Sequence, residues 1–395
     1  MELKVDFSAR AITYTQEEVN KVVEVMTKAS TLTQGEYLAK FESKAKKYFD
    51  VNNVFAVANG TNALELSAIL SNLKEGDEVI IPSHTFCASA IPFARTGAKI
   101  VWADIDPDTR LIDPEDIKRK ITDKTKALVI VHLYGMSCDM DAIMNIVNEH
   151  NLVLTEDCAQ SLGAEYKGRK TGTFGDFAIF SLHTQKNITT LGEGGLLIVK
   201  DDNIAKNIPG LRHNGLRGFT GEREYYWKPA MANVDLDIDE LLPHNFCITE
   251  VQCALGDMLF DRLDDLNNER IRRANKFRDF LQEFEELNFQ NDTKYDNKHV
   301  YHLLSAKYNG KKYNKTNDDL IDLLFNKYKV KTVVQYCPLN RYPLFEKIGF
   351  GDANCPNSDE FFDNMISFPV QVWMSEDDFD YMIESVKNAL IELRG

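Results

Sequence analysis

Short apolar runs alternate with amphipathic stretches over the first half of the chain. Helical spacing of apolar positions appears at residues 63–73, 115–121 and 140–151. Seven runs between and around them have the length and composition of buried strands: residues 54–58, 78–81, 100–103, 127–132, 152–156, 177–181 and 196–199. This alternation predicts an α/β fold, with a mostly parallel seven-stranded sheet covered by helices.

The second half of the chain has a different pattern. A long amphipathic helix is predicted from residue 249 through 277, and another over 377–393. Strands are predicted at 300–308 and 331–336, on either side of a polar stretch. These elements indicate a smaller C-terminal α+β domain.

The predicted division is a large domain over residues 1–255 and a small domain over 256–395. Two opening helices are predicted at 16–29 and 35–49. The pattern leaves open which of the two domains these opening helices pack on.

Composition narrows the classes of partner and the cellular location. A net charge of -15 over 395 residues argues against nucleic acid or an anionic membrane as the partner. The seven cysteines include no CxxC pair, so we expect reduced thiols rather than disulfides, and no metal site. No signal-peptide pattern and no membrane-spanning apolar stretch is visible, and we expect a cytoplasmic protein.

Polar clusters follow the predicted strands, where ligands of such sheets bind. Gly60, Thr61 and Asn62 follow the first strand and open a helix, a pattern that suits a phosphate site or an ordinary helix cap. Asp157 ends another strand, and could face a cationic ring nitrogen, a structural salt bridge or a metal. Phe86 could stack on a flat ring or belong to the core.

A polar loop separates the last two predicted strands and contains one lysine, Lys186. Apolar surroundings lower the pKa of a lysine, because burial disfavours the charged form. A lysine that is partly neutral can form a Schiff base with an aldehyde. The alternative is an ordinary surface loop in which Lys186 is solvated.

The chain resembles the DegT family of pyridoxal-phosphate-dependent sugar aminotransferases, which have the fold type I architecture. Five motifs that carry the resemblance occur in the family's order and span most of the chain: NGTNAL, PSHTF, EDCAQSLGAEYKG, FSLHTQKNITTLGEGG and HNFCITEVQCALG. Shorter matches lie near the two ends: LTQG at 32–35 and YCPL at 336–339.

The resemblance implies roles for individual residues. Lys186 matches the lysine that binds pyridoxal 5'-phosphate covalently, Asp157 the carboxylate that pairs with the pyridine nitrogen, and Phe86 the aromatic that stacks on the ring. Gln160 matches the residue near the ring hydroxyl, and His183 lies in the family's loop motif. The positions that hold the cofactor phosphate in the family match Thr61, Asn62 and Ser181. Asn245 matches an asparagine that reaches the phosphate across a dimer interface.

The family also contains dehydratases with histidine at the lysine position, so Lys186 favours amino transfer. Three departures from the commonest family pattern are Cys247 in place of a frequent arginine, the stretch 335–337, and the extra Leu191 before the glycines. The first two lie where the acceptor is expected and leave its identity open.

The implied reaction moves an amino group from an amino acid, L-glutamate first among the candidates, to a keto group of a nucleotide-linked sugar. The cofactor passes through its pyridoxamine 5'-phosphate form, in a homodimer with shared active sites. Cationic candidates for the acceptor's phosphates are Arg212, Arg217, Arg223, Lys228 and Arg341. The alternatives are a small phosphorylated ketone as acceptor, a sugar dehydratase, or a non-catalytic binding protein on this fold.

Overall fold

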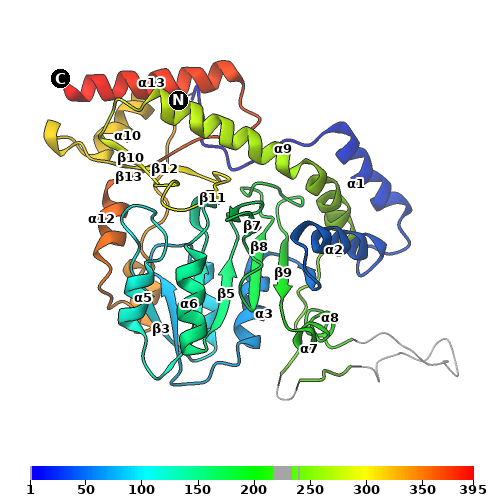
Figure 1. The fold of residues 1–395 in the computed structure, drawn as a ribbon. Helices are drawn as coiled ribbons and strands as arrows, with labels where there is room; N and C mark the ends of the chain where they lie inside the picture. The colour runs from blue at the N-terminus through cyan, green and yellow to red at the C-terminus, as the bar shows by residue number, and fades with distance from the viewer. Residues whose placement is uncertain (1, 217–233, 239–240) are drawn as a thin grey trace, which may run out of the picture.

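The computed structural model describes residues 2–216, 234–238 and 241–395, and its centre is a seven-stranded sheet (Figure 1). The strand order is β1-β9-β8-β5-β4-β2-β3. The strands are β1 (Val54–Val57), β2 (Glu78–Pro82), β3 (Lys99–Ala103), β4 (Thr125–Val131), β5 (Val153–Asp157), β8 (Phe177–Ser181) and β9 (Gly195–Val199). All seven predicted strands are therefore confirmed within a few residues.

Six of the strands run in the same direction, and β9 is antiparallel to both of its neighbours, β1 and β8. The antiparallel pairing arises because the polar loop joins β8 and β9 directly, which places Ser181 opposite Gly195. The sheet is mostly parallel, as predicted, and includes one antiparallel hairpin, β8–β9, whose loop contains Lys186.

Helices cover both faces of the sheet. Val79 and Ile81 of β2 pack in one core with residues of α3 and α4, whereas Ile80 packs in another core with residues of α5 and α6. The helices of this part are α3 (Gly60–Leu70), α4 (Ile91–Arg95), α5 (Pro114–Lys120), α6 (Met140–His150), α7 (Asp202–Ala205) and α8 (Ile208–Leu211).

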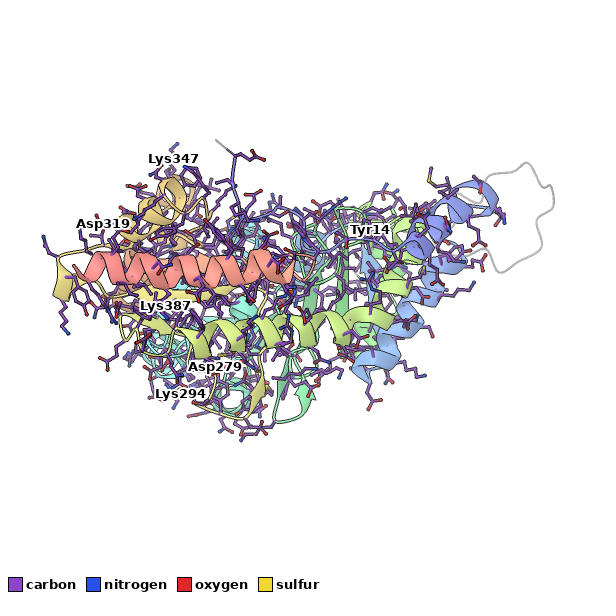
Figure 2. The ribbon with its side chains drawn as sticks, turned by 90° about the horizontal axis from the view of Figure 1, so that it is seen from above. Tyr14, Asp279, Lys294, Asp319, Lys347 and Lys387 are labelled. Atoms are coloured by element: carbon purple, nitrogen blue, oxygen red, sulfur yellow. The ribbon has the colours of Figure 1, made fainter. Side chains whose placement is uncertain are left out.

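The C-terminal part contains a three-stranded antiparallel sheet in the order β10-β12-β13, with long helices beside it (Figure 2). Its elements are β10 (Leu287–Phe289), β12 (Leu304–Tyr308), β13 (Met365–Phe368), α9 (Glu250–Phe280), α10 (Asn317–Asn326), α11 (Pro343–Lys347), α12 (Pro356–Asn364) and α13 (Glu376–Arg394). A small third sheet joins β6 (Glu165–Tyr166), β7 (Arg169–Lys170) and β11 (Asn297–Lys298). Among the described helices, none is long and apolar enough to cross a membrane.

Two strand predictions for this part need correction. The segment 331–336 is not a strand. An isolated bridge joins its Val333 to Ser367, and a second bridge, just before the segment, joins Val330 to Val5. The segment 300–308 begins its strand only at Leu304, because Tyr301 has a φ of 43°, which interrupts the extended backbone. The strand β13, which pairs with β12, was not predicted from the sequence.

The opening helices α1 (Gln16–Lys28) and α2 (Glu36–Phe49) lie beside the first half of α9 (Figure 1). Phe41 and Phe49 of α2 share a core with Phe180 of β8 and with Phe260 of α9. The two helices therefore pack on the large sheet and the start of α9, which resolves the question that the sequence pattern left open.

Helix α2 receives its N-terminal cap from a residue far away in the sequence. The carboxylate of Glu250 accepts hydrogen bonds from the backbone N–H groups of Gly35 at 2.8 Å, Tyr37 at 2.8 Å and Leu38 at 3.2 Å. The first N–H groups of a helix lack intrahelical acceptors, and an anion is favourable beside them. Glu250, which is 1% exposed, therefore fixes α2 to the start of α9.

We predict that Glu250→Ala lowers the free energy of unfolding by about 2–4 kcal/mol, because one buried and two partly buried N–H groups lose their acceptor. Glu250→Gln retains one oxygen and should cost about 1 kcal/mol. Chemical denaturation measures both. Glu36→Gln is the matched control: it lies in the same helical turn but is solvent-exposed and paired only with Lys40, so its effect should stay within about 0.5 kcal/mol. If Glu250→Ala and Glu36→Gln lowered the free energy of unfolding equally, the capping role of Glu250 would be contradicted.

Candidate active site

A cavity of about 490 Å³ lies at the carboxyl ends of β5 and β8 and the start of α3. Gln335 and Tyr336, from the C-terminal part, complete its wall. Nine of the ten residues selected from the sequence line this one cavity: Gly60, Thr61, Asn62, Phe86, Asp157, Gln160, Ser181, His183 and Lys186. The sequence motifs are thus brought together as expected for strand ends at one edge of a sheet.

Asn245 is the tenth residue, and it does not line the cavity of its own chain. It is exposed and forms an isolated bridge with His213. A role at the cofactor would therefore require the cavity of a second copy, as the sequence prediction stated.

The start of α3 is held tightly against the β8–β9 hairpin. Asn59 caps the helix, accepting a hydrogen bond from the N–H of Asn62 at 2.8 Å. A Cβ atom at Gly195 would lie 2.5 Å from the carbonyl carbon of Asn59, and one at Gly60 would lie 3.0 Å from the Cβ of Ser181. Only glycine permits this approach, which leaves the helix start and the Ser181 hydroxyl side by side as an anion cradle.

Asp157 is 3% exposed at the end of β5. Its Oδ2 accepts a hydrogen bond from the Ser89 hydroxyl at 2.7 Å, and its Oδ1 accepts one from the N–H of Ala159 at 3.0 Å. Burial raises the pKa of this carboxyl, and the two hydrogen bonds and the nearby Lys186 oppose the rise only in part. Asp157 is therefore a carboxylate that a cationic group in the cavity would stabilise strongly. Ser89 could not be recognised as a partner of Asp157 from the sequence, because the two residues are 68 positions apart.

The loop around Lys186 is a hydrogen-bonded hairpin. Leu182 and Thr184 donate their N–H groups to the carbonyls of Gly194 and Gly192, at 2.8 Å and 2.9 Å. Leu191, the extra residue of the turn, has a φ of 61°, in the left-handed region. The alternative of an ordinary solvated surface loop does not fit this geometry, because hydrogen bonds hold the turn and Lys186 lines the cavity.

Burial lowers the pKa of Lys186 to about 8, although the nearby Asp157 opposes this change. A substantial fraction of Lys186 is therefore neutral near pH 7.5, and a neutral amine is nucleophilic and can accept a proton.

Gln160 connects the cavity floor to the C-terminal part. Its Oε1 accepts a hydrogen bond from the N–H of Tyr134 at 2.7 Å, and its Nε2 donates one to the hydroxyl of Tyr336 at 3.0 Å. The Tyr336 ring lies 5.7 Å from the ring of Phe86, at an angle of 59°. Phe86 itself is 51% exposed, so it forms a wall of the cavity rather than part of the core. The contact between Gln160 and Tyr336 was missed because it joins residues 176 positions apart.

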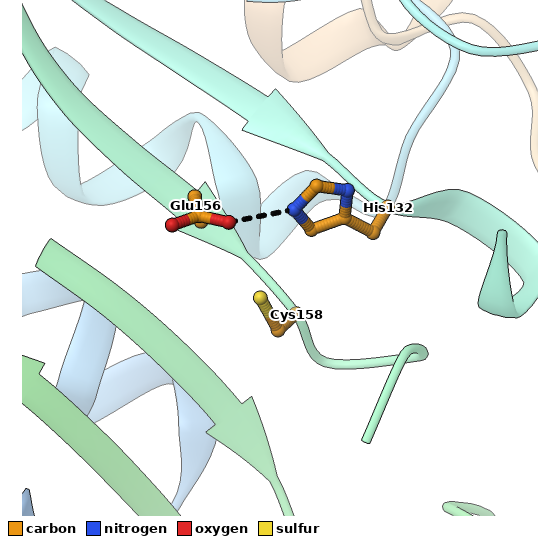
Figure 3. A group of neighbouring side chains, drawn as sticks. All are labelled: His132, Glu156 and Cys158. Atoms are coloured by element: carbon orange, nitrogen blue, oxygen red, sulfur yellow. Dashed lines mark hydrogen bonds and ion pairs between the residues drawn. The ribbon is translucent and has the colours of Figure 1, made fainter. Parts of the chain in front are cut away.

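A buried group of His132, Glu156 and Cys158 lies at the ends of β4 and β5 (Figure 3). His132 Nε2 lies 3.0 Å from Glu156 Oε2, and its Nδ1 accepts the N–H of Cys138 at 3.0 Å. Both oxygens of Glu156 also accept backbone N–H groups, from Gly172, Phe174 and Gly175. With its donors and acceptors in use, the group is a structural hydrogen-bond network that fixes the end of β5, and not an open metal site.

Of the cationic candidates for the acceptor's phosphates, the two that the structure describes, Arg212 and Arg341, do not line the cavity. Arg212 is 4% exposed, forms an ion pair with Glu42, and donates to the carbonyl of Ala56 at 2.7 Å. Arg341 lies on the surface with Asp359 and Asp363. Arg217, Arg223 and Lys228 lie outside the described residues.

Comparisons with known proteins agree with this geometry. The chain is 32% identical over 381 residues to the Bacillus subtilis spore coat polysaccharide biosynthesis protein SpsC, with 94% of each chain covered. It is 30% identical to the GDP-perosamine synthase of Escherichia coli O157:H7, over 87% of this chain and 91% of that one.

A structure from Streptococcus pneumoniae, described as a sugar aminotransferase in its PMP form, superposes with a TM-score of 0.85 at 25% identity. The match covers 98% of this chain and 100% of that one. The model of the DegT/DnrJ/EryC1/StrS aminotransferase family matches residues 13–387. The chain therefore belongs to the DegT/DnrJ/EryC1/StrS aminotransferase family and is a pyridoxal-phosphate-dependent transaminase of fold type I.

Proposed function

We propose that the protein transfers an amino group from an amino acid, most simply L-glutamate, to a keto group of a nucleotide-linked sugar. One observation carries this proposal: the lysine with a lowered pKa and the buried carboxylate Asp157 face the same cavity. The similarity to GDP-perosamine synthase supports a nucleotide-linked sugar as the acceptor.

The residues of the cavity fit pyridoxal 5'-phosphate. We infer that the start of α3, with Thr61, Asn62 and the Ser181 hydroxyl, holds the phosphate, because Gly60 and Gly195 leave room for a close approach. Asp157 would pair with the ring nitrogen, Phe86 would cover the ring, and Lys186 would hold the cofactor covalently. When bound, the cofactor supplies an electron sink for the carbon that loses its proton.

The remaining chemistry is assigned to the chain's own side chains. Lys186 Nζ, when released, takes the proton from Cα of the amino donor, which its pKa near 8 permits at neutral pH. Asp157 keeps its negative charge opposite the ring nitrogen and so keeps that nitrogen protonated. Gln160 holds the hydroxyl of Tyr336, which lines the cavity beside Phe86.

The sugar dehydratase is the second candidate reaction. It would need a base at position 186 that cannot recapture the cofactor, whereas a lysine amine can do so. A small phosphorylated ketone remains the alternative acceptor, because Cys247 and Gln335 alter the region where the acceptor is expected.

A cytoplasmic location is also proposed. All seven cysteines are free, as expected of a reducing compartment. Detection of the protein only in a secreted or periplasmic fraction would contradict it.

We predict that an amino donor alone converts the bound cofactor to pyridoxamine 5'-phosphate. L-glutamate, and then L-glutamine, should shift the absorbance of the holoenzyme before any sugar is added, and a keto sugar should restore it. Lys186→Arg should abolish the shift, because its guanidinium stays protonated. If no amino acid shifts the spectrum, and a keto sugar instead loses water with pyridoxamine 5'-phosphate, the dehydratase is the correct function.

Asp157→Asn should leave the fold intact and reduce turnover by about a hundredfold or more, because the ring nitrogen loses its charged partner. Ser89→Ala removes only a hydrogen bond to Asp157 and should have a smaller effect, about tenfold. Steady-state rates with saturating donor compare the two. Near-normal turnover of Asp157→Asn would refute the assignment.

We further propose a homodimer in which Asn245 reaches the cofactor phosphate of the second subunit. Lys186→Arg should be inactive and Asn245→Ala weakly active, and mixing them through reversible dissociation should restore about a quarter of the wild-type rate, since half of the dimers have one intact site. Sedimentation should detect a dimer. An active monomer, or no recovery on mixing despite exchange of subunits, would exclude the shared site.

A further inference from the structure

A small side chamber of about 40 Å³ adjoins the main cavity on the other side of Lys186. The two share Gln185, Lys186, Gln335 and Tyr336 as walls. A volume of this size holds two or three water molecules or one carboxylate group, and it is too small for a sugar ring.

Arg270 of α9 forms a wall of this chamber and is 3% exposed. Its Nη2 donates one long hydrogen bond, to the carbonyl of Ala11 at 3.5 Å, and its Nε has no hydrogen-bond partner. Within the part of the chain that the structure describes, no carboxylate pairs with Arg270, and burial lowers the pKa of its guanidinium to about 10. A buried guanidinium with most of its five donors unused is costly unless an anion completes it.

Arg273, one helical turn along on α9 and equally buried, provides the contrast. It forms an ion pair with Glu269 at 2.6 Å and donates to the carbonyls of Gln371 at 2.6 Å and Met374 at 2.8 Å. The fold therefore supplies partners for one buried arginine and leaves the other open toward the chamber.

The rest of the chamber favours an anion. Its walls include the cations Lys186 and Arg270 but no aspartate or glutamate, in a chain with a net charge of -15. His302, whose pKa burial lowers well below its usual value, is neutral, and its Nδ1 lies 3.2 Å from Asn187 Oδ1. The apolar part of the wall consists of Leu303, Phe368 and Val370. These side chains exclude water and so strengthen an ion pair in the chamber.

We propose that Arg270 binds the α-carboxylate of the amino donor in this chamber. The inference rests on the proposed amino transfer, in which Cα of the donor must come within reach of Lys186 Nζ. The α-carboxylate is one bond from Cα, so a carboxylate receptor must lie beside the lysine, and Arg270 is the unpaired guanidinium in that position. The guanidinium fork matches a carboxylate with two parallel hydrogen bonds.

Stability gives the first test, and it is independent of activity. Removing an uncompensated buried charge should leave the melting temperature of Arg270→Met unchanged or raise it. Arg273→Met, the matched control, should lower the melting temperature, because it breaks the ion pair with Glu269 and two buried hydrogen bonds. A loss of stability in Arg270→Met equal to that of the control would show that Arg270 has a structural partner, and would overturn the proposal.

Donor preference gives the second test, with L-glutamate and 4-aminobutanoate as probes. Both carry an amine and a distal carboxylate, but only L-glutamate has an α-carboxylate. The wild-type holoenzyme should prefer L-glutamate, and Arg270→Met should lower kcat/KM for L-glutamate by about tenfold to a hundredfold while that for 4-aminobutanoate stays unchanged. An equal loss for both donors would overturn the assignment to the α-carboxylate.

A third measurement uses the cofactor-free protein and formate, so it stands even if amino transfer fails. Formate bound beside Lys186 favours the charged amine, so it should raise the pKa of Lys186 above about 8. The pH dependence of Lys186 labelling by an amine reagent, measured by peptide mass spectrometry, reports this pKa. Formate should raise the pKa of Lys186 in the wild type but not in Arg270→Met. The rise in the wild type should persist when chloride is added to compete with formate. No response to formate in the wild type would overturn the carboxylate site.

Discussion

The close contact between the start of α3 and the β8–β9 hairpin is the constraint on which the active site depends. Gly195 of β9 lies against the backbone of Asn59, so closely that a Cβ atom would be 2.5 Å from its carbonyl carbon. Because β9 is inserted between β1 and β8, the helix that follows β1 and the loop that follows β8 meet at one point. The anion cradle and Lys186 therefore have a fixed separation, set by backbone packing rather than by flexible side chains.

The two neighbouring carboxylates of β5 differ in how many hydrogen-bond donors the fold supplies to them. This difference distinguishes a structural carboxylate from one that is free to bind a ligand. Glu156 is saturated by His132 and three backbone N–H groups, which hold its pKa below its usual value despite full burial. Its neighbour Asp157 has fewer donors, and burial raises its pKa. These adjacent residues of one strand thus point to opposite sides of the sheet. Glu156 has all its hydrogen-bond donors within the fold, whereas Asp157 faces the cavity and can bind a cationic ligand.

The sequence predicted the parts of this site that depend on local order along the chain. Strand ends, helix starts and the lysine loop follow from periodicity and glycine placement, and nine selected residues meet in one cavity. Contacts between distant segments could not be predicted in this way. Arg270 reads as one polar position of a long amphipathic helix, and only its three-dimensional surroundings show that it lacks a partner. The segment 331–336 has the composition of a strand. In the structure it is not part of a sheet, and its last two residues, Gln335 and Tyr336, line the cavity.

Helix α9 belongs to two hydrophobic cores. Leu259 and Phe260 pack with the opening helices and the large sheet, whereas Ala274 and Phe277 pack with the small antiparallel sheet and α13. The predicted division at residue 255 falls inside this continuous helix, so no flexible linker separates the two halves there. Unfolding of either core would remove the packing partners of one half of α9. The remaining half of the helix would then be less stable, because the two halves share one continuous backbone. The chain should behave as one cooperative folding unit, in which a defect far from the cavity is transmitted along the helix axis.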